Sequence, residues 1–416
     1  MQPIQSLTGI FIITGLAWLL SENRRYVPWK TVLSGLVLQF FLALVFLKFT
    51  PAQNLFKALN RIVMLLNEAT TAGTSFVFGY LGGGEFPVTV ADPATVFILA
   101  FRALPIVIVV SALSALLFYW KILPWLVTQF SRLLTLTMGI GGALGLGSAA
   151  NIFVGMIEAP LFIRPYLSKL SRSEMFALMT TGMATVAGTV MVLYATILSG
   201  IQADALGHIL SASVISIPAA LLIAFILVPG RDDDSPVGKD IYLHSEASGA
   251  MDAITRGTLD GVRLVINITA MLIVFVALVA LINLFLELLP EIGGEPVSLQ
   301  RILGIVFAPL VWLMGIPADE MLQAGSLMGI KTILNEFLAY LELVKLPPGA
   351  LSERSRMIML YALCGFANFG SLGIMLGGLG TMVPERRVEI AGLGLKSILA
   401  GTLATMMTGA YAGLLL

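Results

Sequence analysis

Long apolar runs separated by short polar segments make up most of this sequence. A helix needs about 20 apolar residues to cross the hydrocarbon core of a membrane. Eight runs are of that order, and we interpret each as a span: 4–21, 31–49, 91–120, 175–203, 205–228, 264–286, 357–383 and 391–416. The pattern predicts an all-α polytopic membrane protein with eight transmembrane helices.

Three further apolar stretches are shorter or amphipathic, with cationic residues at or near their edges. They are 51–69, 122–137 and 303–315, and the cations are Lys57, Arg61, Arg132 and Arg301. Such segments are typical of helices that lie at the membrane interface. A glycine-rich stretch, 70–87, reads as a connection, and 231–253 reads as a solvated linker between two halves.

A carboxylate follows the apolar run 133–157 directly, at Glu158, and a helix-breaking Ala159-Pro160 comes next. An ionisable group in the membrane costs about 2.5–3.5 kcal/mol on insertion scales, so it survives mainly where it faces a cavity, an ion or a polar substrate. The glycine-rich start and the proline favour two half-spanning helices that meet at a tip. We therefore predict a re-entrant hairpin here.

The same spacing occurs again in the second half. Gly147-Ser148 precedes Glu158 by eleven residues, and Gly325-Ser326 precedes Glu336 by eleven. In both halves the predicted order is interfacial helix, hairpin with Glu, interrupted span, closing span. An inverted repeat of this kind is the sequence-level indication of a secondary transporter.

Small and hydroxyl residues interrupt the spans that follow the two hairpins, at 180–190 and 365–373. Unwinding there would free carbonyl groups for a cation and side chains for a polar substrate. Asn368 and Glu336 are expected to bind a ligand, because a polar or charged side chain in mid-membrane costs free energy unless it has a partner. Thr180, Thr181 and Thr189 are expected to serve close helix packing.

Composition supports a membrane protein and limits the partners and metal sites that the chain can have. Hydrophobic residues make up 58% and charged residues 12% of the chain, and the formal net charge is +0, which disfavours a nucleic-acid partner. The only cysteine is Cys364, expected to serve packing, and the two histidines are His208 and His244. This excludes an intrachain disulfide and disfavours a His/Cys metal centre.

The distribution of Lys and Arg predicts the orientation. The basic segments 22–30, 164–172 and 386–387 fall on one side if the spans alternate, and we assign that side to the cytoplasm. The N-terminus and C-terminus then lie outside a cell inner membrane. The loop with Lys345, Arg354 and Arg356 also falls outside and is an exception to the rule.

With these elements, the sequence resembles the concentrative nucleoside transporter family across essentially the whole chain. The matching stretches are Gly73-Thr-Ser-Phe-Val-Phe-Gly79, Phe101-Arg-Ala-Leu-Pro105, Ala149-Ala-Asn-Ile-Phe-Val-Gly155, Glu158-Ala-Pro160, Ile163-Arg-Pro165, Asn335-Glu-Phe337, Cys364-Gly-Phe-Ala-Asn368 and Leu376-Gly-Gly-Leu-Gly380. The resemblance implies a homotrimer in the lipid bilayer that works by an elevator mechanism and imports nucleosides with sodium as coupling ion. It implies no cofactor and no enzymatic activity.

Domain boundaries follow from the predicted elements and the resemblance. Residues 1–120 are mainly scaffold spans 1–3 with an interfacial helix. The first transport-domain repeat is 121–230, the cytoplasmic linker is 231–253, scaffold span 6 is 254–290, and the second transport-domain repeat is 299–416.

The resemblance also implies site residues, all named here by their numbers in this chain. A sodium ion would bind Asn151, the Val154 carbonyl, Thr185 and the Val186 carbonyl. The nucleoside sugar would meet Glu336, Asn368 and Ser371, with Phe366 and Val190 as apolar walls and Glu158 near the sugar and base edge.

One departure concerns the base. Similar family members commonly read Gly-Gln-Thr-Glu at the first tip, where this chain has Gly155-Met156-Ile157-Glu158. Losing a polar contact to a buried group typically costs about 1–3 kcal/mol. The base preference of the family therefore does not transfer, and a purine, a modified base or broadened specificity are all open.

Sodium-coupled import has three alternatives. Proton coupling through Glu158 or Glu336 is the first, and the oxygen ligands Asn151 and Thr185 argue for sodium instead. A membrane-embedded enzyme would need a nucleophile with a base or a metal cluster, and neither glutamate has a histidine near it in sequence. An ion channel fits hairpins of opposed entry less well than alternating access does.

Overall fold

The computed structural model describes residues 2–85, 98–230, 247–291, 294 and 296–416, and this part of the chain contains helices and no β-strand. The first half comprises α1 (Gln2–Leu19), α2 (Trp29–Lys48), α3 (Thr50–Phe78), α4 (Leu99–Arg102), α5 (Ile106–Tyr119), α6 (Ile122–Met138), α7 (Gly142–Ala150), α8 (Glu158–Phe162), α9 (Arg164–Leu167), α10 (Arg172–Ala184), α11 (Gly188–Leu198) and α12 (Ala205–Leu227). The second half comprises α13 (Ala250–Leu286), α14 (Leu299–Leu313), α15 (Met321–Ile333), α16 (Glu336–Lys345), α17 (Glu353–Leu363), α18 (Phe369–Met382) and α19 (Arg387–Leu415).

Six helical segments of the described residues are long and apolar enough to cross a membrane. They are Trp29–Lys48, Leu99–Tyr119, Arg172–Leu198, Ala205–Leu227, Ala250–Leu286 and Pro384–Leu415. The other two predicted spans correspond to α1 and to the α17–α18 pair, which is interrupted by five residues. Part of the predicted span 91–120, residues 91–97, lies outside the described residues. The fold class is confirmed as all-helical, and the count of eight spans stays a prediction.

Two predicted boundaries were wrong. The connection expected from residue 70 is helical up to Phe78, and within this helix the Thr70 and Thr71 hydroxyls donate to the carbonyls of Leu66 and Asn67. The chain turns at Gly79, where φ is 60°.

The linker boundary at residue 253 was also misplaced. Helix α13 begins at Ala250, and the Ser248 backbone N–H and hydroxyl both donate to the Asp252 side chain in its first turn, which fixes how the chain enters the helix. The rest of the linker, 231–246, lies outside the described residues.

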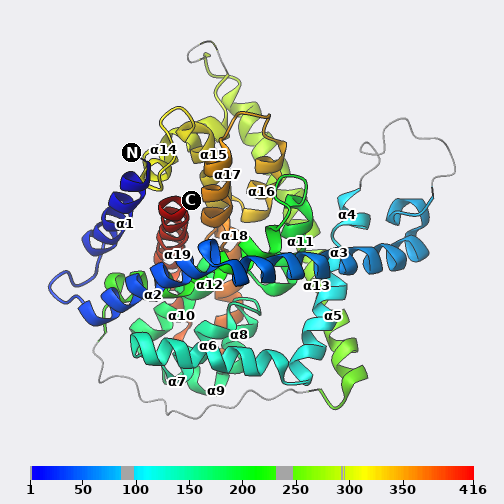
Figure 1. The fold of residues 1–416 in the computed structure, drawn as a ribbon, viewed down its shortest axis with the longest axis horizontal. Coiled ribbons are helices and arrows are strands. Elements are labelled where there is room, and N and C mark those ends of the chain that lie inside the picture. The colour runs from blue at the N-terminus through cyan, green and yellow to red at the C-terminus, as the bar shows by residue number, and fades with distance from the viewer. Residues whose placement is uncertain (1, 86–97, 231–246, 292–293, 295) are drawn as a thin grey trace.

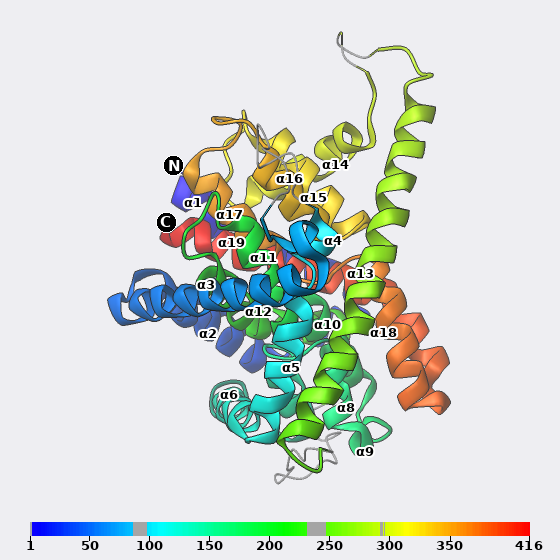
Figure 2. The same ribbon diagram turned by 90° about the vertical axis from the view of Figure 1, so that its right-hand side faces the viewer.

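The two predicted hairpins lie toward opposite ends of the molecule (Figure 1). Helices α7, α8 and α9 lie near α6 at one end, whereas α15 and α16 lie near α14 at the other, and Figure 2 shows the same separation from the side. Helix α14 packs along α15 as α6 packs along α7. This arrangement agrees with two hairpins that enter the membrane from opposite sides.

Both termini lie at the end that carries the second hairpin (Figure 1). The Arg354 side chain donates to Gln2 Oε1 at 3.1 Å and also to the Gly413 carbonyl. Gln5 Nε2 donates to the Ile316 carbonyl at 3.1 Å.

The segments predicted to face the cytoplasm come together at the opposite end. Glu22, just after α1, pairs with Arg172 at 2.6 Å and with Lys396. Arg386 donates to the Leu170 carbonyl at 2.6 Å and pairs with Glu389 at 2.7 Å. The basic segments therefore lie close together, and the side of the membrane that they face stays a prediction.

We expect the Glu22→Gln variant to melt about 1–3 °C lower than the native protein at pH 7. This difference should shrink as the pH falls below the ordinary glutamate pKa of 4.5 and vanish only below the lowered pKa of Glu22. Burial would raise the pKa of Glu22, but the hydrogen bonds and positive charges of Arg172 and Lys396 outweigh it and lower that pKa. A lowered carboxyl pKa stabilises the fold above its ordinary value and loses that contribution as the carboxylate is protonated. Thermal unfolding at several pH values measures this, and a pH-independent difference would contradict it.

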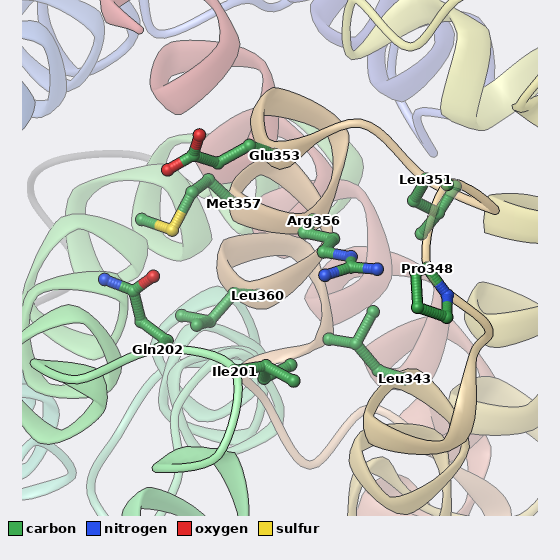
Figure 3. A pocket seen from close by; sticks show the side chains of 10 residues that line it. Ile201, Gln202, Leu343, Pro348, Leu351, Glu353, Arg356, Met357 and Leu360 are labelled. Atoms are coloured by element: carbon green, nitrogen blue, oxygen red, sulfur yellow. The ribbon is translucent and has the colours of Figure 1, made fainter.

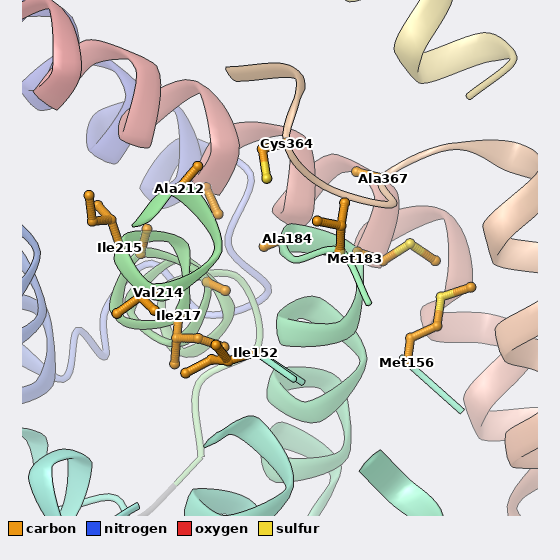
Figure 4. Close-up of a cluster of buried hydrophobic side chains, with 14 of the residues drawn as sticks. Ile152, Met156, Met183, Ala184, Ala212, Val214, Ile215, Ile217, Cys364 and Ala367 are labelled. Atoms are coloured by element: carbon orange, nitrogen blue, oxygen red, sulfur yellow. The ribbon is translucent and has the colours of Figure 1, made fainter. Parts of the chain in front are cut away.

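The core lies where α10, α12, α17 and α19 pack against one another. Helix α12 is buried along most of its length and packs against α2, α10 and α19, and α1 runs along α19. Figure 4 shows Met183 and Ala184 close to Cys364 and Ala367, which belong to two segments far apart in sequence. Cys364 is fully buried, as predicted from the sequence.

Helices α5 and α13 pack on each other, and the apolar membrane segment of α13 has none of its residues buried. Figure 2 shows α13 as a long helix along the outside of the molecule. So large an apolar surface needs lipid or another protein subunit to cover it.

Candidate functional site

Both interrupted spans are broken where the sequence predicted, and the two breaks touch. Helix α10 ends at Ala184 and α11 begins at Gly188, while α17 ends at Leu363 and α18 begins at Phe369. The Phe366 backbone N–H donates to the Thr185 carbonyl at 3.2 Å. One break thereby satisfies a backbone group that the other break leaves without a helical partner.

Glycine is required at this contact. A methyl group on Gly365 would lie 2.7 Å from Thr405 Cγ2 of α19 and 3.0 Å from the Met183 carbonyl oxygen. The first separation is shorter than real carbon contacts allow and the second is tight, so a side chain here would push the second break away from α19 and from the end of α10.

Glu336 is the centre of a buried polar network beside the breaks. Its side chain accepts from the Tyr194 hydroxyl at 2.5 Å through Oε1 and from Asn368 Nδ2 at 2.9 Å through Oε2. The residue is 3% exposed and Asn368 is fully buried. The structure therefore brings together two of the three predicted sugar-binding residues by direct contact.

Local helix starts hold these groups in place. Asn335 Oδ1 caps α16 by accepting from Leu338 N at 2.8 Å, and Asn368 Oδ1 caps α18 by accepting from Ser371 N at 2.7 Å. Glu336 is the first residue of α16, where the positive end of the helix dipole favours a carboxylate. Ser371, in the first turn of α18, is 8% exposed, and its backbone N–H bonds to the Asn368 side chain of the network.

Tyr194 was missed by the sequence analysis. It lies in the apolar helix α11, far from Glu336 in the chain, and a tyrosine among apolar residues has no local feature that distinguishes a ligand from a packing residue. Val190, one of the predicted apolar walls, is one helical turn before Tyr194 and shares its face of α11. Phe366, the other wall, is half-buried in the second break.

The predicted sodium ligands surround the first break. Asn151 ends α7, is 1% exposed and donates through Nδ2 to Thr181 Oγ1 at 3.1 Å. Among the described residues, its Oδ1 atom is buried without a hydrogen-bond partner. Thr185 Oγ1 donates to the Thr181 carbonyl at 2.9 Å, so Thr181, expected only to pack, links the two.

An unpartnered buried oxygen is costly, and a cation is one way to satisfy it. The other predicted ligands are the carbonyl of buried Val186, whose N–H faces Ser213 Oγ at 3.4 Å, and that of half-buried Val154. All are oxygens, which is the donor type that a hard cation takes. The residues present therefore fit a sodium ion.

The tip of the first hairpin is arranged differently from the second. The Glu158 carboxylate folds back over Gly155, where a methyl group would lie 2.1 Å from Oε2. Glu158 is exposed, and among the described residues no hydrogen bond joins it to Glu336, Asn368 or Ser371. It therefore stands outside the buried network.

Met156 and Ile157 point toward different helices. Met156 is 8% exposed and packs on α10, with its Cβ 2.9 Å from a methyl group placed on Gly182. Ile157 packs on α18, 3.1 Å from a methyl group placed on Gly378. Gly378 is seven residues after Ser371 and so shares its helix face.

A cavity of about 330 Å³ opens at the end of the molecule that carries the second hairpin (Figure 3). Its polar lining is Gln202, Glu353 and Arg356, and its apolar lining includes Leu343 and Leu360. None of the predicted ligands lines it, so this cavity is separate from the predicted site.

Family comparison decides the class. The model for the Na+ dependent nucleoside transporter C-terminus matches residues 208–413, the model for the N-terminus of the same family matches 8–81, and a nucleoside recognition (Gate) model matches 100–200. The chain belongs to the Na+ dependent, or concentrative, nucleoside transporter family. It is accordingly a membrane transporter and not an enzyme, and sodium serves this family as a coupling ion and not as a resident cofactor.

Relatives match along nearly the whole chain. An uncharacterized transporter of Bacillus subtilis, YutK, is 38% identical with 100% of both chains covered. The nucleoside permease NupC of Helicobacter pylori is 36% identical, covering 98% of this chain and 97% of the permease. Human solute carrier family 28 member 3 is 35% identical over 100% of this chain and 60% of its own length.

Solved structures of this transporter family share the fold. CNTnw in an inward-facing substrate-bound state is 35% identical, with 99% of this chain and 98% of that chain covered and a TM-score of 0.89. A CNTnw variant in an outward-facing state is 34% identical, with 100% and 98% covered and a TM-score of 0.92.

Proposed function

We propose that this transporter imports nucleosides across the cell inner membrane in symport with sodium, with both termini outside. The observation that carries the substrate assignment is the buried Glu336 network. A carboxylate kept in the membrane interior by a tyrosine hydroxyl and an amide can exchange these partners for the hydroxyl groups of a ribose.

The proposed substrate site follows the predicted residues. Glu336, Asn368 and Ser371 bind the sugar, and Phe366 with Val190 form apolar walls. Tyr194 joins this set because it already donates to Glu336. The base end is formed by Met156 and Ile157, with Glu158 near the sugar and base edge.

Sodium is favoured over a proton by the unpartnered Asn151 oxygen. Proton coupling through Glu158 or Glu336 would leave that buried acceptor unexplained. We assign the ion to Asn151 Oδ1, the Val154 carbonyl, Thr185 and the Val186 carbonyl.

The contact between the breaks offers a route for coupling the two ligands. An ion that orders the first break also orders the Thr185 carbonyl, which accepts from Phe366 N, and Phe366 is two residues before Asn368. Sodium binding therefore favours the backbone conformation that presents Asn368 to the sugar. By linkage, the nucleoside must raise the affinity for sodium by the same factor.

Transport itself is proposed to follow the elevator mechanism in a homotrimer. Family structures solved in inward-facing, intermediate and outward-facing states support a moving unit. The proposed division is scaffold in 1–120 and 254–290, and transport domain in 121–230 and 299–416. Helices α5 and α13, both assigned to the scaffold, pack as a pair. The other scaffold helices α1 and α2 instead share long faces with α19 and α12, which are assigned to the transport domain.

Uptake of radiolabelled uridine and adenosine into proteoliposomes tests this function. Sodium and proton gradients are imposed separately, with potassium replacing sodium as the control. We expect accumulation with an inward sodium gradient alone. Accumulation that ignores sodium and follows the proton gradient would instead support the proton-coupled alternative.

The apolar tip predicts weak selection among bases. Apolar contacts discriminate small changes by only about 1–3 kcal/mol, whereas a site built on hydrogen bonds rejects the wrong partner more sharply. We expect uridine, cytidine and adenosine to compete within about tenfold of one another, and loss of a ribose hydroxyl to cost more. The double variant Met156→Gln, Ile157→Thr should sharpen base selection in competition assays and leave the ribose requirement unchanged. An unchanged ranking would remove Met156 and Ile157 from the base pocket.

A further inference from the structure

Lys331 is a buried cation that neither the sodium site nor the substrate site uses. It lies in the last turn of α15 and is 0% exposed. Its ammonium donates to Thr405 Oγ1 of α19 at 3.1 Å, and the buried Glu336 carboxylate follows five residues later, across the hairpin turn. A charge of this kind is retained inside a membrane mainly where an opposite charge, polar backbone groups or a polar cavity compensates it.

The turn between the two helices of the hairpin places the opposite charges at matching helix ends. Lys331 lies at the C-terminal end of α15, where the helix dipole is negative, and Glu336 lies at the N-terminal end of α16, where it is positive. Both side chains are almost fully buried. The hairpin tip is therefore electrically balanced by its own residues.

The internal repeat gives Lys331 a counterpart in the first hairpin. In the register that aligns Gly147 with Gly325 and Glu158 with Glu336, Lys331 corresponds to Phe153, next to the proposed sodium ligand Val154. The end of α7 offers an unpartnered oxygen of Asn151, whereas the end of α15 offers an ammonium group.

The ammonium also reaches the second break, as the proposed sodium ion reaches the first. Thr405, which accepts from Lys331, lies against Gly365 between α17 and α18. Each hairpin thus faces one broken helix, and a positive charge stands at each junction if sodium occupies the first.

We propose that Lys331 is a tethered cation, a positioning residue that supplies to the second hairpin the positive charge that sodium supplies to the first, and that it holds Glu336 ionised and oriented for the sugar. The comparison with sodium and the effect on the sugar rest on the proposed function. The charge pairing of Lys331 with Glu336 is independent of the proposed function.

A double-mutant cycle on thermal stability tests the charge pairing without any ligand. We expect Lys331→Met to lower the melting temperature by about 5 °C or more, because Glu336 is left as an uncompensated buried charge. Adding Glu336→Gln to Lys331→Met should recover at least half of that loss. A double variant no more stable than Lys331→Met would overturn the pairing. Lys345→Met is the matched control, because Lys345 is in the same hairpin but exposed and paired with Glu342.

Ligand-induced stabilisation tests the positioning role. We expect Lys331→Met to weaken uridine or adenosine binding at least tenfold and to retain the rise in melting temperature caused by sodium chloride relative to N-methylglucamine chloride. Lys331→Arg should restore most of the nucleoside affinity, and Thr405→Val, which removes the hydrogen bond but not the charge, should cost less than threefold. Native nucleoside affinity in Lys331→Met, or equal losses in Thr405→Val and Lys331→Met, would overturn the positioning role. A native protein that responds to neither sodium nor nucleoside would contradict the proposed function and leave the stability cycle valid.

Discussion

Replacing Glu336 by alanine is expected to abolish nucleoside binding in a protein that still folds. Hydrogen bonds to a buried charged group contribute about 1.5–3 kcal/mol each, and two sugar hydroxyls would lose their acceptor. Because about 1.4 kcal/mol corresponds to a tenfold change, the dissociation constant should rise by at least about 100-fold. Nucleoside-induced stabilisation and isothermal titration calorimetry both measure this.

Control variants separate ligand loss from unfolding. Glu342→Ala changes a carboxylate in the same helix that is exposed and paired with Lys345, and it should bind nucleoside normally. The absolute melting temperature of Glu336→Ala should fall, since Lys331 and Tyr194 lose a buried partner. The measurement that decides is the rise in melting temperature caused by nucleoside. A rise in Glu336→Ala as large as in the native protein would remove Glu336 from the site.

Asn151→Leu is expected to eliminate the sodium dependence of both stability and uptake. The substitution removes the unpartnered Oδ1 atom and fills its place with a branched apolar group. A hard cation in a medium of low dielectric constant depends on every oxygen ligand it has, so we expect sodium affinity to fall by at least about 100-fold. Nucleoside affinity should fall with it, because the two are linked.

Thr180→Val is the matched control for Asn151→Leu. Thr180 neighbours Thr181 on α10 and is fully buried, but its hydroxyl donates to the Phe176 carbonyl of its own helix. Sodium titrations followed by thermal unfolding and by uridine uptake should leave this variant unchanged. Retained sodium stabilisation in Asn151→Leu would place the ion elsewhere.

Several local features followed from the sequence because they depend on neighbouring residues. Apolar runs, glycine-rich interruptions and the position of prolines predicted the spans and the two breaks. The start of α10 is also readable, since Ser171 and Glu174 form a capping box whose two hydrogen bonds are present. The error at residue 70 has a local cause as well: the threonines were read as part of a loop, and their hydroxyls bond within the helix.

Site residues could be predicted individually, but their partners could not. A carboxylate or an amide in an apolar segment stands out because it is costly there, which singled out Glu336, Asn368 and Glu158. The same reasoning applies to Lys331 and should have found it. Tyr194 offers no such signal, because tyrosine is common in apolar helices and its role depends on a carboxylate 142 residues away.

What the sequence determined by itself is the set of helices, their interruptions and the charges placed between them, because hydrophobic period and helix capping act over a few residues. Only the tertiary structure decided which groups meet: Tyr194 with Glu336, Thr185 with Phe366, and Lys331 with Thr405. It also showed no hydrogen bond, among the described residues, between Glu158 and the buried network around Glu336. The physical reason is that, inside an apolar run, hydropathy is the same on every face of the helix, so only packing against distant segments selects the face that each polar group takes.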